Sequence, residues 1–79
     1  MAAFGSRARE VQRARTYSKR HNCQVNVEHV IKGRDKGRYY AAEKGYDEGC
    51  WCAGTVVEVV AVYKNGVRKP LDWAIEEES

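Results

Sequence analysis

The chain has 79 residues, of which 43% are hydrophobic and one is a proline. This length accommodates one domain, residues 1–79, and the composition argues against pervasive disorder. No segment approaches the ~20 apolar residues of a transmembrane helix, and the basic residues 1–7 lack the apolar stretch of a secretory signal. We therefore expect no membrane association and a cytoplasmic location.

The net charge of +3 conceals an uneven distribution of charge along the chain. Residues 1–44 contain eleven Lys/Arg and four Asp/Glu, whereas residues 45–79 contain three and seven. Two explanations are open. The basic half is available to an anionic partner, or the two halves attract each other within the fold.

The first predicted element is a helix over residues 6–21, with Ser6 as its N-cap and Asn22 as its stop. Helical spacing places Val11, Ala14 and Ser18 on one side of this helix. The opposite side carries a stripe made of Arg9, Arg13, Thr16 and Arg20, which Arg15 and Lys19 flank.

Residues 24–31 alternate polar and apolar side chains, which is typical of a half-buried strand. The residues predicted to share its inner face are Val25, Val27, His29 and Ile31. A glycine-containing turn over residues 32–38 then leads to a second strand at 39–42. This pattern predicts a hairpin with a basic tip.

Residues 43–49 are polar and contain two glycines, so they are predicted to form a loop. The strongest strand pattern follows at 55–63, where both faces are apolar except at Glu58. We expect this strand to lie in the centre of a sheet or to pair across a dimer, because an exposed apolar edge promotes aggregation. Asn65 and Gly66 then predict a type I′ hairpin turn.

Pro70 is suited to the first turn of a short C-terminal helix, with Leu71, Ala74 and Ile75 on one side. The predicted fold class is therefore α+β. In this fold an N-terminal helix packs on a three- to four-stranded antiparallel sheet, and a short helix follows at the C-terminus.

The odd number of cysteines favours reduced thiols over a disulfide framework. A zinc site could be formed by His21, Cys23, Cys50 and Cys52. One intervening residue is an unusual ligand spacing, however. The competing interpretation is that the cysteines are small core residues and that His21 is a solvated helix end. We expect no bound metal and no cofactor.

Catalysis is not expected, because the chain offers few groups that could perform it. His21 and His29 are the two histidines available as bases, and His29 is in phase with apolar strand residues, which predicts partial burial. Neither a phosphate-binding loop nor a dinucleotide fingerprint is present.

The remaining pattern is a set of cations with tyrosines close by. Lys and Arg can neutralise phosphates, and Tyr17, Tyr39 and Tyr40 can stack on unpaired bases. We therefore expect a non-enzymatic module, monomeric or homodimeric, that binds nucleic acid or a nucleoprotein. Its predicted binding residues are Arg9, Arg13, Arg20, Lys32, Arg34, Lys36, Arg38, Tyr39 and Tyr40.

The alternative is a small inhibitor or adaptor of the kind that phages encode. Such a protein would block a larger host machine, such as a CRISPR or other defence complex, through protein contacts. This alternative rests on the small size of the chain and its lack of catalytic residues, and not on a motif.

Overall fold

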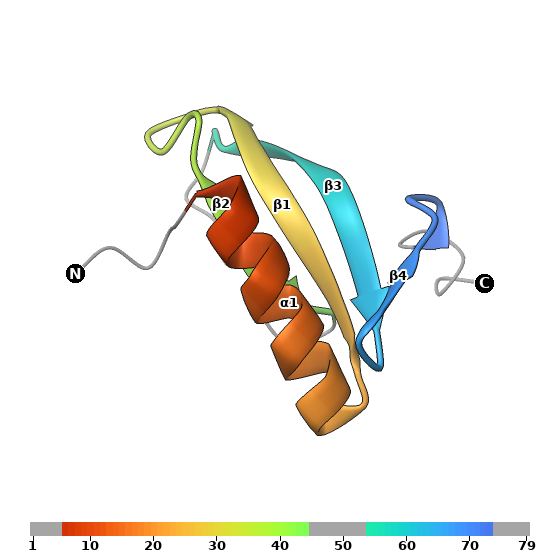
Figure 1. The fold of residues 1–79 in the computed structure, drawn as a ribbon. Helices are drawn as coiled ribbons and strands as arrows, with labels where there is room; N and C mark the ends of the chain where they lie inside the picture. Colours follow the sequence, from red (N-terminus) through yellow and green to blue (C-terminus); the bar gives the residue numbers. More distant parts are fainter. Residues whose placement is uncertain (1–5, 45–53, 74–79) are drawn as a thin grey trace.

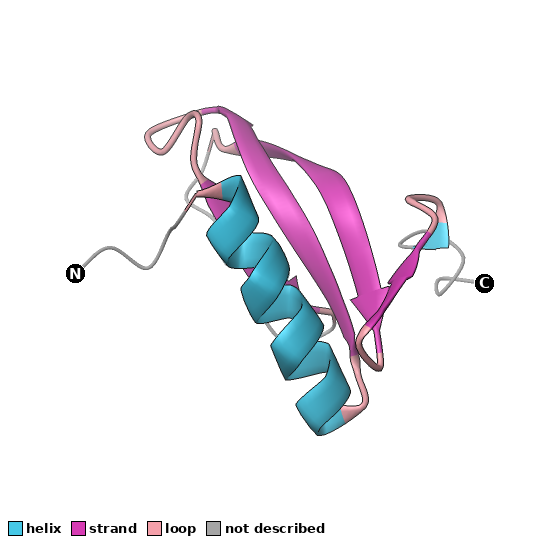
Figure 2. Ribbon diagram, viewed as in Figure 1, coloured by secondary structure: helices cyan, strands magenta, loops and turns pink. Residues whose placement is uncertain are grey.

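The structure is a computed structural model that describes residues 6–44 and 54–73. The elements in chain order are α1 (Arg7–His21), β1 (Gln24–Lys32), β2 (Tyr39–Glu43), β3 (Val56–Lys64) and β4 (Val67–Lys69). The strands form one antiparallel sheet in the order β2-β1-β3-β4. Helix α1 lies across one face of this sheet (Figures 1 and 2). The predicted α+β class and the N-terminal helix on an antiparallel sheet are confirmed.

Both predicted ends of α1 are confirmed. Ser6 is the N-cap, and its Oγ accepts a hydrogen bond from the Arg9 backbone N at 3.3 Å. At the other end Asn22 adopts the left-handed conformation with φ 49°, which asparagine tolerates better than most residues. The helix therefore starts and stops through local interactions that its own sequence supplies.

Two hairpins build the sheet, and both were predicted. In the first, β1 pairs with β2 so that Val27 lies opposite Ala41. In the second, Asn65 and Gly66 connect β3 to β4 with φ values of 52° and 79°. A type I′ turn requires positive φ at both central positions, which explains the Asn-Gly pair.

The central position of β3 is confirmed, since it lies between β1 and β4. The prediction that Ile31 shares the inner face of β1 is wrong. The register between β1 and β3 shifts between Val30 and Lys32, and Ile31 is 40% exposed. An extra residue in one strand interrupts the two-residue alternation, so the sequence pattern no longer predicts the face beyond it.

The main core lies between α1 and the sheet. Its buried members are Ala14, Val25, Val27, Ala41, Ala61 and Tyr63. Strand residues that alternate with these on β1 and β3 are also buried, including Val62 at 0% and Asn26 at 2% exposure. Both faces of β3 are thus buried over Ala61, Val62 and Tyr63, while its first residue, Val56, is 44% exposed.

Several predictions concern residues outside the described part of the chain. Residues 74–79, which include most of the predicted C-terminal helix, and residues 45–53, which include most of the predicted loop, are not described. Strand β2 includes Glu43, so the predicted loop begins one residue later than expected. Within the described ranges, no helix has the length and hydrophobicity needed to cross a membrane.

Candidate functional site

Charges are segregated by depth in the first half of the protein. Its carboxylates are shielded: Glu10 and Glu28 are 1% and 6% exposed, and Asp35 and Glu43 are half-buried. Every lysine and arginine from residue 7 to residue 38 is exposed. The surface of this half is therefore dominated by positive charge, even though the sequence also contains acids.

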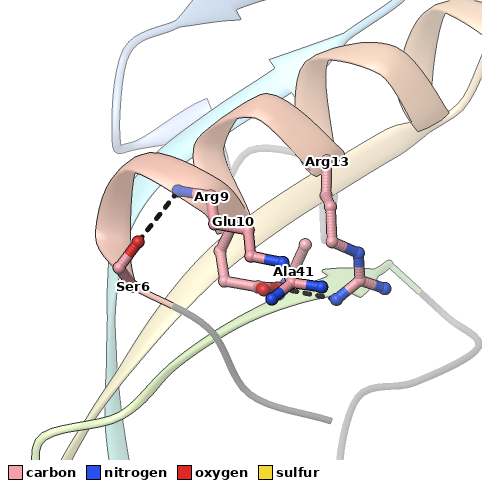
Figure 3. Close-up of polar contacts among 5 residues, drawn as sticks. All are labelled: Ser6, Arg9, Glu10, Arg13 and Ala41. Carbon is pink, nitrogen blue, oxygen red and sulfur yellow. Dashed lines mark hydrogen bonds and ion pairs between the residues drawn. The ribbon is translucent and has the colours of Figure 1, made fainter.

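Glu10 is a buried carboxylate beneath this surface, and the sequence analysis missed its structural role. Its Oε1 accepts hydrogen bonds from the Ala41 backbone N at 3.0 Å and from Arg13 Nη1 at 2.8 Å (Figure 3). Ala41 belongs to the edge strand β2, so no neighbouring strand accepts a hydrogen bond from its outward N–H. Glu10 supplies that acceptor instead. The signal was its spacing: Glu10 lies four residues before Ala14, on the buried side of the helix.

Ser18 makes the corresponding connection two turns later. Its hydroxyl donates to the Arg15 carbonyl at 3.2 Å and accepts from the Gly66 backbone N at 2.9 Å. Glu10 thus ties the first half of α1 to β2, and Ser18 ties the second half to the β3–β4 turn. The solvent side of the helix is consequently held in a fixed orientation relative to the sheet.

We define the outer face of α1 as its exposed surface, which has two basic flanks and an uncharged crest. On the β2 flank, the Arg13 guanidinium lies 6.0 Å from the centre of the Tyr40 ring. On the opposite flank, Arg15 lies 5.6 Å from the centre of the Tyr63 ring. The residues of the outer face are Arg9, Arg13 and Arg20 on the β2 flank, Arg15 and Lys19 on the opposite flank, and Gln12 and Thr16 at the crest.

Within residues 6–44 and 54–73, two arginines of this outer face have no acidic partner. Arg9 and Arg20 form no ion pair with any residue in the described part of the chain. Arg9 extends to the same side of the helix as Arg13 (Figure 3), and like charges four residues apart cost about 0.2–0.5 kcal/mol per pair. The single acidic residue of α1, Glu10, is buried. Lys19 and Arg20 lie in the last turn, where cations interact favourably with the helix dipole, whereas Arg9 lies in the first turn, where they do not.

The basic hairpin tip, Lys32, Arg34, Lys36 and Arg38, lies at the same end of the molecule as the first turn of α1 (Figure 1). The side chains of Lys32, Arg34 and Lys36 are exposed and form no ion pair with a described residue. Arg38 Nε lies 3.8 Å from Asp35 Oδ1. The tip therefore adds positive charge at the end of the molecule where α1 begins.

The tyrosines predicted to stack on bases already have partners within the protein. Tyr39 stacks on His29 with ring centres 4.4 Å apart and packs against the core. Tyr40 is half-buried beside Arg13. Tyr17 donates its hydroxyl to Glu43 Oε1 at 2.8 Å, and its ring lies 4.2 Å from that of His21. Tyr39 and Tyr40 are thus half-buried against the protein, whereas Tyr17 is 41% exposed.

The predicted zinc ligands fall partly outside the described residues, since Cys50 and Cys52 are not described. His21 is exposed, and Cys23 is half-buried. Burial raises the pKa of the Cys23 thiol, and the Glu43 carboxylate raises this pKa further, while Lys64 opposes the shift. Among the residues that the structure describes, no group of three or more His, Cys, Asp or Glu could hold a metal ion.

The remaining histidine is a strand residue. His29 is half-buried, as its phase with the apolar residues of β1 predicts. Its Nδ1 lies 3.4 Å from Glu58 Oε2 on β3. This contact joins neighbouring strands across the sheet.

Comparison with protein-family models, with curated proteins and with solved structures finds no match for this chain. The outer face of α1 and the basic hairpin tip are the features of the described residues that bear on function. These two surfaces combine exposed cations, a fixed backbone and shielded carboxylates.

Proposed function

We propose that this protein is a non-enzymatic module that binds nucleic acid through the outer face of α1 and the basic hairpin tip. The observation that carries the proposal is the segregation of charge in residues 7–43. The carboxylates there are buried or half-buried, and the cations of residues 7–38 are exposed. A surface of this kind attracts a polyanion and releases the counterions that the polyanion had condensed.

The side chains favour phosphates over an acidic protein surface as the partner. Protein interfaces usually depend on buried aromatic or large apolar anchors. The crest of α1 instead presents Gln12 and Thr16, with arginine on both flanks. Arginine offers a planar fork of donors that matches phosphate geometry. The odd number of cysteines supports placing this activity in a reducing compartment such as the cytoplasm.

The proposal is tested by fluorescence anisotropy with a labelled mixed-sequence DNA duplex at low salt. The test variant is Arg9→Ala/Arg20→Ala, which removes two exposed charges that make no described ion pair. Arg13 is left intact because it bonds to the buried Glu10. We expect affinity to fall about tenfold, from two lost phosphate contacts of roughly 0.5–1 kcal/mol each.

The control is Lys64→Ala/Lys69→Ala, which removes the same charge from strands β3 and β4. Lys64 Nζ donates to the Asn22 carbonyl at 3.4 Å, and Lys69 Nζ lies 5.0 Å from the centre of the Trp73 ring, so neither cation belongs to the outer face of α1. This control should bind nearly as tightly as the wild type. Equal weakening of the two variants would show that net charge matters and the outer face does not. If no nucleic acid binds at low salt, while the protein co-purifies with one protein from nuclease-treated lysate, the inhibitor alternative replaces this proposal.

A further inference from the structure

We propose that α1 is a recognition helix that enters the major groove of B-form DNA, with Gln12 and Thr16 reading base edges and the two flanks contacting phosphates. This inference rests on the proposed function and names its ligand. It follows from the order of side chains around the outer face. A surface that binds phosphates alone has no need of an uncharged crest between two basic flanks.

The dimensions of the helix agree with those of the groove. An α-helix with its side chains is about 10–12 Å wide, and the major groove of B-DNA is about 12 Å wide. When the crest points to the groove floor, Arg13 on one flank and Arg15 on the other face the two phosphate backbones. Contacts on opposite sides of the helix separate these arginines, since Arg13 lies by Tyr40 and Arg15 by Tyr63.

The crest side chains have the chemistry that base reading requires. A glutamine amide can bond to N6 and N7 of adenine, and a threonine offers both a hydroxyl and a methyl group that contacts thymine. Gln12 and Thr16 are exposed, and Gln12 Nε2 donates to Thr16 Oγ1 at a long 3.3 Å. They are one turn apart, a rise of about 6 Å, which spans roughly two base pairs at 3.4 Å each.

The other forms of nucleic acid fit this surface less well. In A-form RNA the major groove is deep and narrow and does not admit a helix. Single strands are bound mainly by stacking on aromatic side chains. Of the three tyrosines near this surface, Tyr39 and Tyr40 are half-buried and Tyr17 is 41% exposed, so they offer one exposed ring rather than a row of rings for successive bases. B-form DNA is therefore the ligand that the outer face accommodates.

Two further features support a docked helix. Glu10 and Ser18 hold α1 to backbone N–H groups at opposite ends of the sheet, so the crest is presented on a rigid support. The basic hairpin tip lies at the same end of the molecule as the first turn of α1 (Figure 1), and its exposed cations are available to phosphates outside the groove that holds the helix. Phosphate contacts of this type set the register of a protein on DNA.

The first experiment compares three probes of one sequence: a 20-base-pair DNA duplex, the corresponding RNA duplex and the DNA single strand. We expect the DNA duplex to bind at least about tenfold more tightly than the other two at equal salt. Equal binding of all three probes would overturn the groove inference and leave the proposed function intact. Binding of none would overturn both.

The second experiment selects preferred sites from a DNA duplex with a randomised centre. Wild-type protein should enrich a defined sequence. In Gln12→Ala and Thr16→Ala the preference for that site over a scrambled duplex should fall about tenfold, with affinity for the scrambled duplex unchanged.

Arg9→Ala/Arg20→Ala is the matched control for base reading. It should weaken binding to the selected and scrambled duplexes equally and leave the preference between them unchanged. Failure of the wild type to enrich any sequence would overturn the assignment of base reading to the crest. So would an unchanged preference in both crest variants.

Discussion

The two faces of α1 treat polar groups in opposite ways. On the inner face, Glu10 and Ser18 are buried and each accepts a hydrogen bond from a backbone N–H of the sheet or its turn. On the outer face, Arg9 and Arg20 carry full charges with no ion pair to a described residue. The difference separates the roles of one helix: its inner polar groups stabilise the fold, and its outer ones are available to a ligand.

The largest expected effect is on the inner face. Glu10→Ala leaves the Ala41 N–H without its acceptor and removes the partner of Arg13, so the free energy of unfolding should fall by about 3 kcal/mol. Urea denaturation followed by circular dichroism measures this change. Glu10→Gln keeps an acceptor oxygen and should lose about half as much. A loss below about 0.5 kcal/mol for Glu10→Ala would show that the buried carboxylate is not structural.

Ser18→Ala tests the second anchor. Its hydroxyl is buried, and without it the Gly66 N–H loses its acceptor, so the free energy of unfolding should fall by about 1–2 kcal/mol. Hydrogen exchange at the Gly66 amide should accelerate in this variant, because the bond that protects it is gone. Unchanged exchange at Gly66 would contradict the proposed anchor.

On the outer face, substitutions should leave the free energy of unfolding nearly unchanged. Arg9→Ala/Arg20→Ala should change the free energy of unfolding by less than about 0.5 kcal/mol, because alanine is a good helix former and one like-charge contact is relieved. The same denaturation measurement applies. A loss comparable to that of Ser18→Ala would mean that these arginines support the fold, and the contrast between the two faces would disappear.

The smallest expected effect concerns Cys23, which packs against the core near the end of α1. Burial raises the pKa of its thiol, so less thiolate is present at a given pH and alkylation should be slower than in the unfolded chain. Iodoacetamide labelling of Cys23, followed by peptide mass spectrometry between pH 7 and pH 10, would measure this as a shift of the rate profile to higher pH. An identical profile in the urea-unfolded chain would show that Cys23 is not sheltered.

Most of the fold could be predicted because its signals are local. Ser6 and Asn22 act on the backbone beside them, and Asn65 and Gly66 supply the positive φ that their turn requires. The prediction that Ile31 lies on the inner face of β1 failed for a different reason. The extra residue in β1 arises from pairing with β3, and pairing between strands far apart in sequence leaves no mark in a two-residue alternation.

The candidate site was predictable in its charges and not in its environment. The spacing of Arg9, Arg13 and Arg20 on one flank follows from helical periodicity alone. Helical spacing places Glu10 on the buried side of α1, but its partner Ala41 lies 31 residues away on an edge strand, so no local pattern identifies the bond that it makes. The engagement of Tyr39 likewise depends on the cross-strand position of His29.

The salt dependence of duplex DNA binding tests the central claim most directly. Anisotropy titrations of wild type and Arg9→Ala/Arg20→Ala from 50 to 200 mM salt would give the slope of log affinity against log salt. Each phosphate contact contributes about −0.9 to this slope for duplex DNA. We predict a steep slope for the wild type, and a slope shallower by about 1.8 for the variant. Identical slopes for the two proteins would show that the outer face of α1 does not contact phosphates.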